Sequence, residues 1–139
     1  MTYVPDLSPH TYSNAPGVGQ RLLAVGWLDP AHRFPAGPVP DGFEARLARL
    51  CATATVARTR GIHPCRLPPC TGARVWPPLS IEVDGRAVHL GGAEIRVGFG
   101  TGTWFAAPDL VCHYVTAHGY RPPDEFVAAV LRGDADHGS

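Results

Sequence analysis

Residues 61–72 bring together three side chains that can bind a metal, in a segment that also contains three prolines. His63 lies two residues before Cys65, and Cys70 follows Cys65 at C-x4-C spacing. Thiolates and imidazoles suit a tetrahedral zinc ion, whose structural loops commonly separate cysteines by two to four residues. Because prolines lack N–H donors, this loop has few hydrogen bonds of its own, and a metal would stabilise it. We therefore expect His63, Cys65 and Cys70 to bind one zinc ion.

A structural zinc site needs a fourth ligand, and we expect it to be His113. This histidine lies in a predicted helix, and small zinc modules often combine two thiolates from a turn with an imidazole from a helix. His118 is the alternative. Five residues rotate a side chain by about 140° around an ideal α-helix, so His113 and His118 should bind one ion only if the helix frays. Cys112 is a third alternative, although its position favours the packed core.

A catalytic zinc ion would instead keep one coordination position open to water, beside a carboxylate that acts as a base. Zinc deaminases combine a His-x-Glu segment with P-C-x-x-C, whereas His63-Pro64-Cys65 has no glutamate at that offset. This difference excludes a deaminase. A zinc-dependent hydrolase or lyase remains the alternative function, with no catalytic residue assigned and with side chains near the metal drawn from His118, Glu94, Asp109 and Tyr114.

Composition and charge restrict the class of protein. Twelve basic and twelve acidic side chains give a formal net charge of zero, which argues against a general nucleic-acid binder. No apolar run is long enough to span a membrane, and residues 1–6 lack the pattern of a signal peptide. We therefore expect a cytoplasmic protein without membrane contact. In a reducing compartment its cysteines should be thiols or metal ligands; they are Cys51, Cys65, Cys70 and Cys112.

The length of 139 residues fits one domain, and we expect residues 1–139 to form it, with an irregular N-terminal arm over 1–18 and a frayed tail over 133–139. A compact apolar run predicts a buried strand over 20–29, in which Trp27 packs in the core. Asp41, followed three residues later by Glu44, predicts a capped helix over 41–53 with Cys51 on its packed side. A short strand should follow within 53–60.

Alternating residues and turn signals predict an antiparallel β-meander over 79–106. The turn Asp84-Gly85 should join strands 79–83 and 86–90, and further strands are expected at 94–97 and 103–106. A helix over 109–118 should end before Gly119, and a second helix should open at Pro122-Pro123-Asp124. The predicted fold is therefore a small α+β domain with an antiparallel meander, about three helices and a Cys/His zinc-binding loop.

Several segments resemble a known family. They are residues 24–29 (AVGWLD), the Gly61-x-His63-x-Cys65 loop, and residues 107–110, 113–115 and 118–123. Together they resemble small uncharacterised bacterial proteins, largely actinobacterial, that are grouped as a domain of unknown function. The family's second cysteine follows the first more closely than Cys70 follows Cys65. The resemblance implies one compact domain, supports grouping His63 and Cys65 with His113, and brings no known activity.

These observations predict a zinc-stabilised accessory or binding protein. One Cys2His2-type site would join residues 61–72 to the helix at 109–118 through His63, Cys65, Cys70 and His113. The partner would be a protein or a small molecule, with no nucleic acid and no membrane involved.

Overall fold

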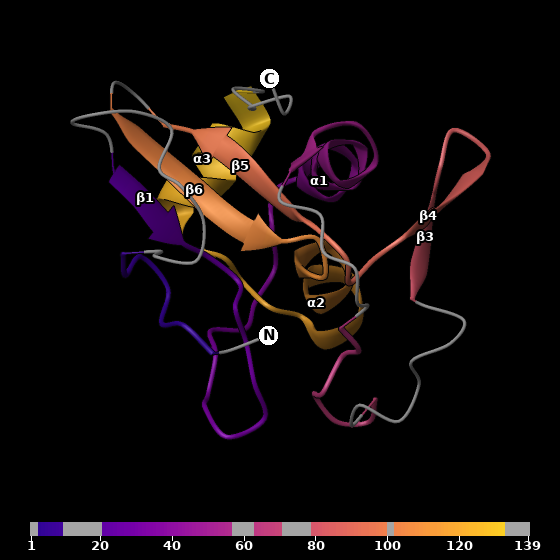
Figure 1. The fold of residues 1–139 in the computed structure, drawn as a ribbon, viewed down its shortest axis with the longest axis horizontal. Coiled ribbons are helices and arrows are strands. Elements are labelled where there is room, and N and C mark those ends of the chain that lie inside the picture. The colour runs from indigo at the N-terminus through magenta and orange to yellow at the C-terminus, as the bar shows by residue number, and fades with distance from the viewer. Residues whose placement is uncertain (1–2, 10–20, 57–62, 71–78, 100–101, 133–139) are drawn as a thin grey trace.

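The computed structural model describes residues 3–9, 21–56, 63–70, 79–99 and 102–132, and within them it confirms an α+β fold with three helices (Figure 1). The strands are β1 (Arg21–Ala24), β2 (Thr55–Val56), β3 (Ser80–Val83), β4 (Arg86–His89), β5 (Glu94–Gly98) and β6 (Thr103–Pro108). The helices are α1 (Phe43–Thr53), α2 (Val111–His118) and α3 (Asp124–Arg132).

The strands form two separate sheets. Four of them pair in the order β1-β6-β5-β2, while β3 and β4 form a hairpin that stands apart in Figure 1. The predicted hairpin at Asp84-Gly85 and the antiparallel pairing of β5 with β6 are both present. The meander does not continue from β4 into β5, because β5 pairs with β6 along one edge and with β2 along the other. In addition, β1 pairs with β6 in parallel, which no local pattern predicted.

The N-cap of helix α1 lies one residue later than the capping pattern predicted. Gly42, with a φ of 86°, precedes its first residue, and no side chain caps the helix, so the prediction that Asp41 is the N-cap is wrong. A left-handed conformation at this position favours glycine and displaces Asp41 from the cap. The packed side is as expected, since Phe43, Leu47 and Cys51 are buried.

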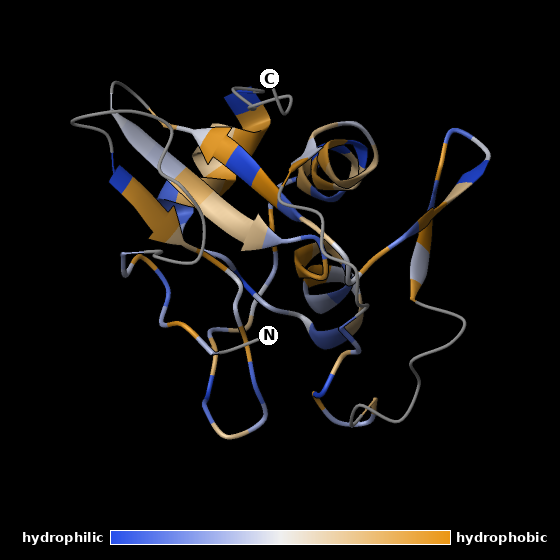
Figure 2. Ribbon diagram, viewed as in Figure 1, coloured by the Kyte–Doolittle hydropathy of each residue, from blue (hydrophilic) through white to orange (hydrophobic). Residues whose placement is uncertain are grey.

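The core lies between the four-stranded sheet and the helices. The rings of Phe43 on α1 and Phe105 on β6 both meet Phe126 on α3 edge to face, at centroid distances of 6.4 Å and 5.9 Å. Figure 2 shows hydrophobic residues concentrated where α3 lies against β5 and β6, and mixed hydropathy along the hairpin. Aromatic packing therefore holds α3 against both the sheet and α1.

The described part of the N-terminal arm runs beside β1. Val4 forms an antiparallel bridge with Trp27, and the Leu7 N–H donates to the Ala24 carbonyl at 2.7 Å. Trp27 is buried, as expected, and its Nε1 donates to the Ala106 carbonyl at 2.9 Å. Residues 10–20 and the predicted tail over 133–139 lie outside the described residues. Among the described helices, none is long and apolar enough to cross a membrane.

Candidate metal centre

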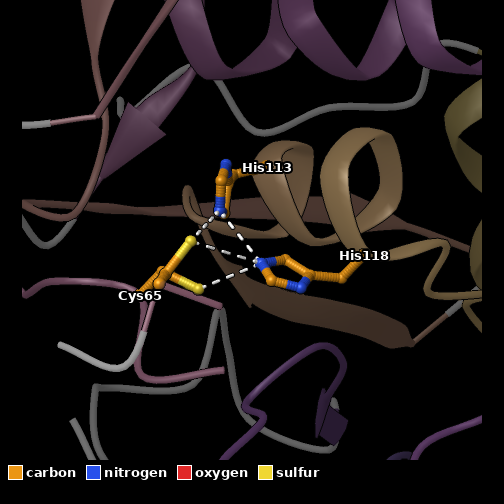
Figure 3. A group of neighbouring side chains, drawn as sticks. Cys65, His113 and His118 are labelled. Carbon is orange, nitrogen blue, oxygen red and sulfur yellow. Dashed lines mark hydrogen bonds between the residues drawn. The ribbon is translucent and has the colours of Figure 1, made fainter. Parts of the chain in front are cut away.

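Four side chains converge at the end of α2, and they could hold a metal ion. They are Cys65, Cys70, His113 and His118, and one ligand atom from each lies within 4.8 Å of all the others. Figure 3 shows His113 and His118 pointing from α2 toward Cys65. The cysteines lie 43 to 53 residues away from the histidines that they meet, so only the tertiary fold assembles the group.

Hydrogen bonding alone does not account for the contacts of His118. Its Nε2 lies 3.2 Å from His113 Nε2, 3.3 Å from Cys65 Sγ and 3.7 Å from Cys70 Sγ. A ring nitrogen has one in-plane site, which carries either one proton or one lone pair. A single proton therefore serves one of these three neighbours. A cation at the centre of the group would interact with all four ligand atoms at once.

The last turn of α2 explains how both histidines reach this site. The Tyr114 carbonyl accepts hydrogen bonds from the N–H of Gly119, five residues on, and of Tyr120, six residues on, at 3.1 Å for the latter. An α-helical bond spans four residues, so this turn is wider than a regular one. Gly119 closes it in the left-handed conformation, with a φ of 69°. The wide turn returns His118 to the side of the helix that carries His113.

The cysteine-bearing segment, residues 63–70, is anchored to the rest of the fold at several points. The His63 N–H donates to the Gly91 carbonyl at 2.8 Å. Cys65 and Leu67 are each 2% exposed, whereas Cys70 is half-buried. The backbone is thus fixed on both sides of Cys65, which points the thiol toward α2.

The Pro68 backbone also acts on His118. It raises the pKa of the imidazole, against the larger lowering by desolvation, and because proline has no N–H, the group responsible is the carbonyl.

The protonation states of the cluster follow from burial. Desolvation lowers the pKa of His113, with a smaller contribution from the charge of His118, and desolvation also lowers the pKa of His118. Burial raises the pKa of the Cys65 thiol to about 11, while the Leu67 backbone N–H opposes this rise and Cys70 adds to it. The imidazoles are therefore neutral acceptors, and a cation would displace the proton of the Cys65 thiol.

The cluster contains three members of the predicted ligand set, Cys65, Cys70 and His113. Its fourth member is His118, where the prediction had His63. His63 instead lines a cavity beside the cluster. The glycine that follows His118 was the available sequence signal, because a left-handed residue after a helix can change the pitch of its last turn. Cys112 is 2% exposed and belongs to the hydrophobic core together with Cys51.

The carboxylates considered as catalytic bases have other contacts. Asp109 is 1% exposed and accepts a hydrogen bond from the Gly91 N–H at 2.7 Å. Glu94 is also buried, and its carboxylate lies 3.7 Å from the Arg96 guanidinium. Tyr114, which was considered together with them, lines the same cavity as His63. The two carboxylates thus interact with other residues of the fold, and neither of them belongs to the Cys/His cluster.

Comparison with known proteins places the chain in a family. No curated protein and no solved structure is detectably similar to it. The family described as "Domain of unknown function (DUF7919)" matches residues 2–131, which include all four side chains of the cluster and every element of the fold up to the last residue of α3. The match agrees with the sequence resemblance to a domain of unknown function. The chain therefore belongs to the family Domain of unknown function (DUF7919).

Proposed function

We propose that Cys65, Cys70, His113 and His118 bind one structural zinc ion, and that the protein is a small zinc-stabilised accessory or binding protein. The observation that carries the proposal is the spacing of the four ligand atoms. Tetrahedral zinc with bond lengths of about 2.3 Å to sulfur and about 2.05 Å to nitrogen places two nitrogens about 3.3 Å apart, and a sulfur and a nitrogen about 3.6 Å apart. The corresponding distances here are 3.2 Å between the nitrogens and 3.3, 3.6 and 3.7 Å between sulfur and nitrogen.

The position of the cluster supports a structural role. Zinc would join residues 63–70, which contain no regular secondary structure, to the C-terminal end of α2. A metal that binds the folded chain but not the unfolded chain adds its binding free energy to folding stability. Four protein donors also complete a tetrahedral shell and leave no position for substrate, which supports a structural site over a hydrolase or lyase site.

Metal analysis of the full-length protein, purified without added zinc, tests the proposal. We expect about one equivalent of zinc, and X-ray absorption at the zinc edge should show two sulfur and two nitrogen neighbours. Removal of the metal by a chelator should lower the melting temperature, and added zinc should restore it. His63→Ala is the matched control, because His63 lies next to the cluster without belonging to it.

Two results would overturn the proposal. Less than about a tenth of an equivalent of bound metal, together with a melting temperature insensitive to chelator, would exclude a structural zinc ion. An oxygen ligand in the zinc shell, with only three protein donors, would instead favour the zinc-dependent hydrolase or lyase.

A further inference from the structure

A cavity of about 260 Å³ lies directly beside the metal cluster. Its lining residues flank the cluster along the chain: Pro64 and Arg66 lie on either side of Cys65, and Tyr114 follows His113. None of the four cluster residues is among the described residues that line it. The cavity is therefore a separate space, with a wall built on the segment that the cluster anchors.

Opposite charges line this cavity without pairing with each other. Within the described part of the chain, the guanidinium of Arg66 has no ion pair or hydrogen bond. Asp29 also lines the cavity, and its Oδ1 atom accepts from the Ala31 N–H at 3.2 Å and contacts His32 Nδ1 at 2.6 Å. Its second oxygen, Oδ2, accepts no hydrogen bond from any described residue. The cavity therefore offers both a cationic group and a carboxylate oxygen to a ligand.

Tyr114 adds a hydroxyl to the lining of the cavity. The residue is 1% exposed, yet its hydroxyl forms no hydrogen bond with any part of the chain that the structure describes. The hydroxyl is not one of the buried polar atoms without a partner, so it keeps some exposure, and a ligand in the cavity would accept a hydrogen bond from it. Leu28, Pro64 and the ring of Tyr3 add apolar surface, and His63 is the remaining lining residue.

We infer that this cavity binds a small zwitterion, an α-amino acid with an apolar side chain. The ligand carboxylate pairs with Arg66 and accepts from the Tyr114 hydroxyl, the ammonium group pairs with Asp29, and the side chain packs on Leu28 and Pro64. A simple inorganic anion fits less well, because the Asp29 carboxylate would repel it. The volume of about 260 Å³ accommodates a molecule of this size.

This inference rests on the proposed function in one respect. Zinc would fix residues 63–70, and that segment supplies His63, Pro64 and Arg66 to the cavity. Zinc content and melting temperature are therefore measured for every protein used in the test.

The test titrates the full-length protein with L-leucine by calorimetry and by ligand-observed NMR. We expect a dissociation constant of about 1 mM or tighter, which is ordinary for a ligand with so few atoms. L-leucine amide lacks the carboxylate and N-acetyl-L-leucine lacks the ammonium group, and each should bind about tenfold more weakly or worse.

Two variants assign each charge to its partner. Arg66→Gln should remove the preference for L-leucine over its amide, and Asp29→Asn should remove the preference for L-leucine over its N-acetyl derivative. Arg86→Gln is the control, because Arg86 is an exposed arginine on β4, outside the cavity. This variant should bind L-leucine as the wild type does.

The outcomes separate the two proposals. A protein that holds one zinc ion and shows no binding of L-leucine up to about 10 mM overturns the cavity inference and leaves the zinc proposal intact. Equal affinity for L-leucine and both derivatives also overturns the inference. A protein without zinc that binds L-leucine with the predicted charge dependence supports the cavity and overturns the structural zinc.

Discussion

The Nε2 atoms of His113 and His118 lie 3.2 Å apart, although five positions of one helix separate the two residues. On a regular α-helix this separation turns the side chains about 140° away from each other. The two histidines meet because the Tyr114 carbonyl closes a wide last turn with Gly119 and Tyr120. The geometry of a helix end thus decides which residues form the Cys/His cluster that could hold a metal.

Gly119→Ala should weaken both folding and metal binding. The left-handed φ of 69° is unfavourable for alanine by about 1–2 kcal/mol, and no atom lies within 4 Å of the added Cβ, so the effect is conformational. A change in the last turn would also move His118. We expect weaker zinc binding, measured by competition with a chromogenic chelator.

Gly42→Ala is the control for this prediction. Gly42 has a φ of 86° and open space around it, but it precedes α1, away from the cluster. The variant should lose a similar free energy of unfolding in denaturant titrations and keep the zinc affinity of the wild type. Equal zinc affinity for Gly42→Ala and Gly119→Ala would show that the wide turn does not control the cluster.

His118→Ala should remove a zinc ligand, whereas His63→Ala should not. For His118→Ala we expect a zinc content below about half an equivalent. The free energy of unfolding should fall by about 3 kcal/mol or more, which lowers the melting temperature by roughly 10 °C at this chain length. For His63→Ala, zinc content should stay near one equivalent. The opposite ranking of the two variants would restore the ligand set first predicted from the sequence.

Gly26→Ala should destabilise the fold strongly. An added Cβ would lie 2.9 Å from Val111 Cγ2, and the φ of 79° is left-handed. Conformational strain and overpacking together should lower the free energy of unfolding by about 2–4 kcal/mol. Gly37→Ala is the control, because its added Cβ meets nothing within 4 Å, and it should change stability by less than about 0.5 kcal/mol. Urea unfolding of both variants measures the difference, and equal stabilities would refute this account of Gly26.

Tyr120→Phe should cost more stability than Tyr114→Phe, although both side chains are buried tyrosines. The Tyr120 hydroxyl donates to Asp6 Oδ2 at 2.8 Å and ties the N-terminal arm to the residues after α2. Losing a hydrogen bond to a carboxylate should cost about 1.5–2 kcal/mol. Tyr114→Phe removes a hydroxyl with no partner in the described residues and should change stability by less than about 0.5 kcal/mol. Thermal melts that rank the variants in the reverse order would contradict this assignment.

Local patterns predicted the elements of the fold more fully than their arrangement. Asp84-Gly85 predicted its hairpin because a two-residue turn is encoded by the residues that form it. The apolar spacing of Phe43, Leu47 and Cys51 likewise identified the buried side of α1. The parallel pairing of β1 with β6 joins residues about eighty positions apart, as in Leu22 opposite Trp104, and no local pattern carries that information.

The sequence by itself determined the chemistry of the candidate site. Cys65, Cys70 and His113 have the donor atoms and the loop-and-helix setting that suit a tetrahedral metal, and these properties belong to the residue types and their spacing. Only the tertiary structure brought His113 and His118 together in the cluster and left His63 outside it, because the meeting of the two helix histidines depends on the pitch of one helical turn. That pitch depends on how the end of the helix is closed, and for that reason the geometry of an ideal helix favoured only one of the two histidines.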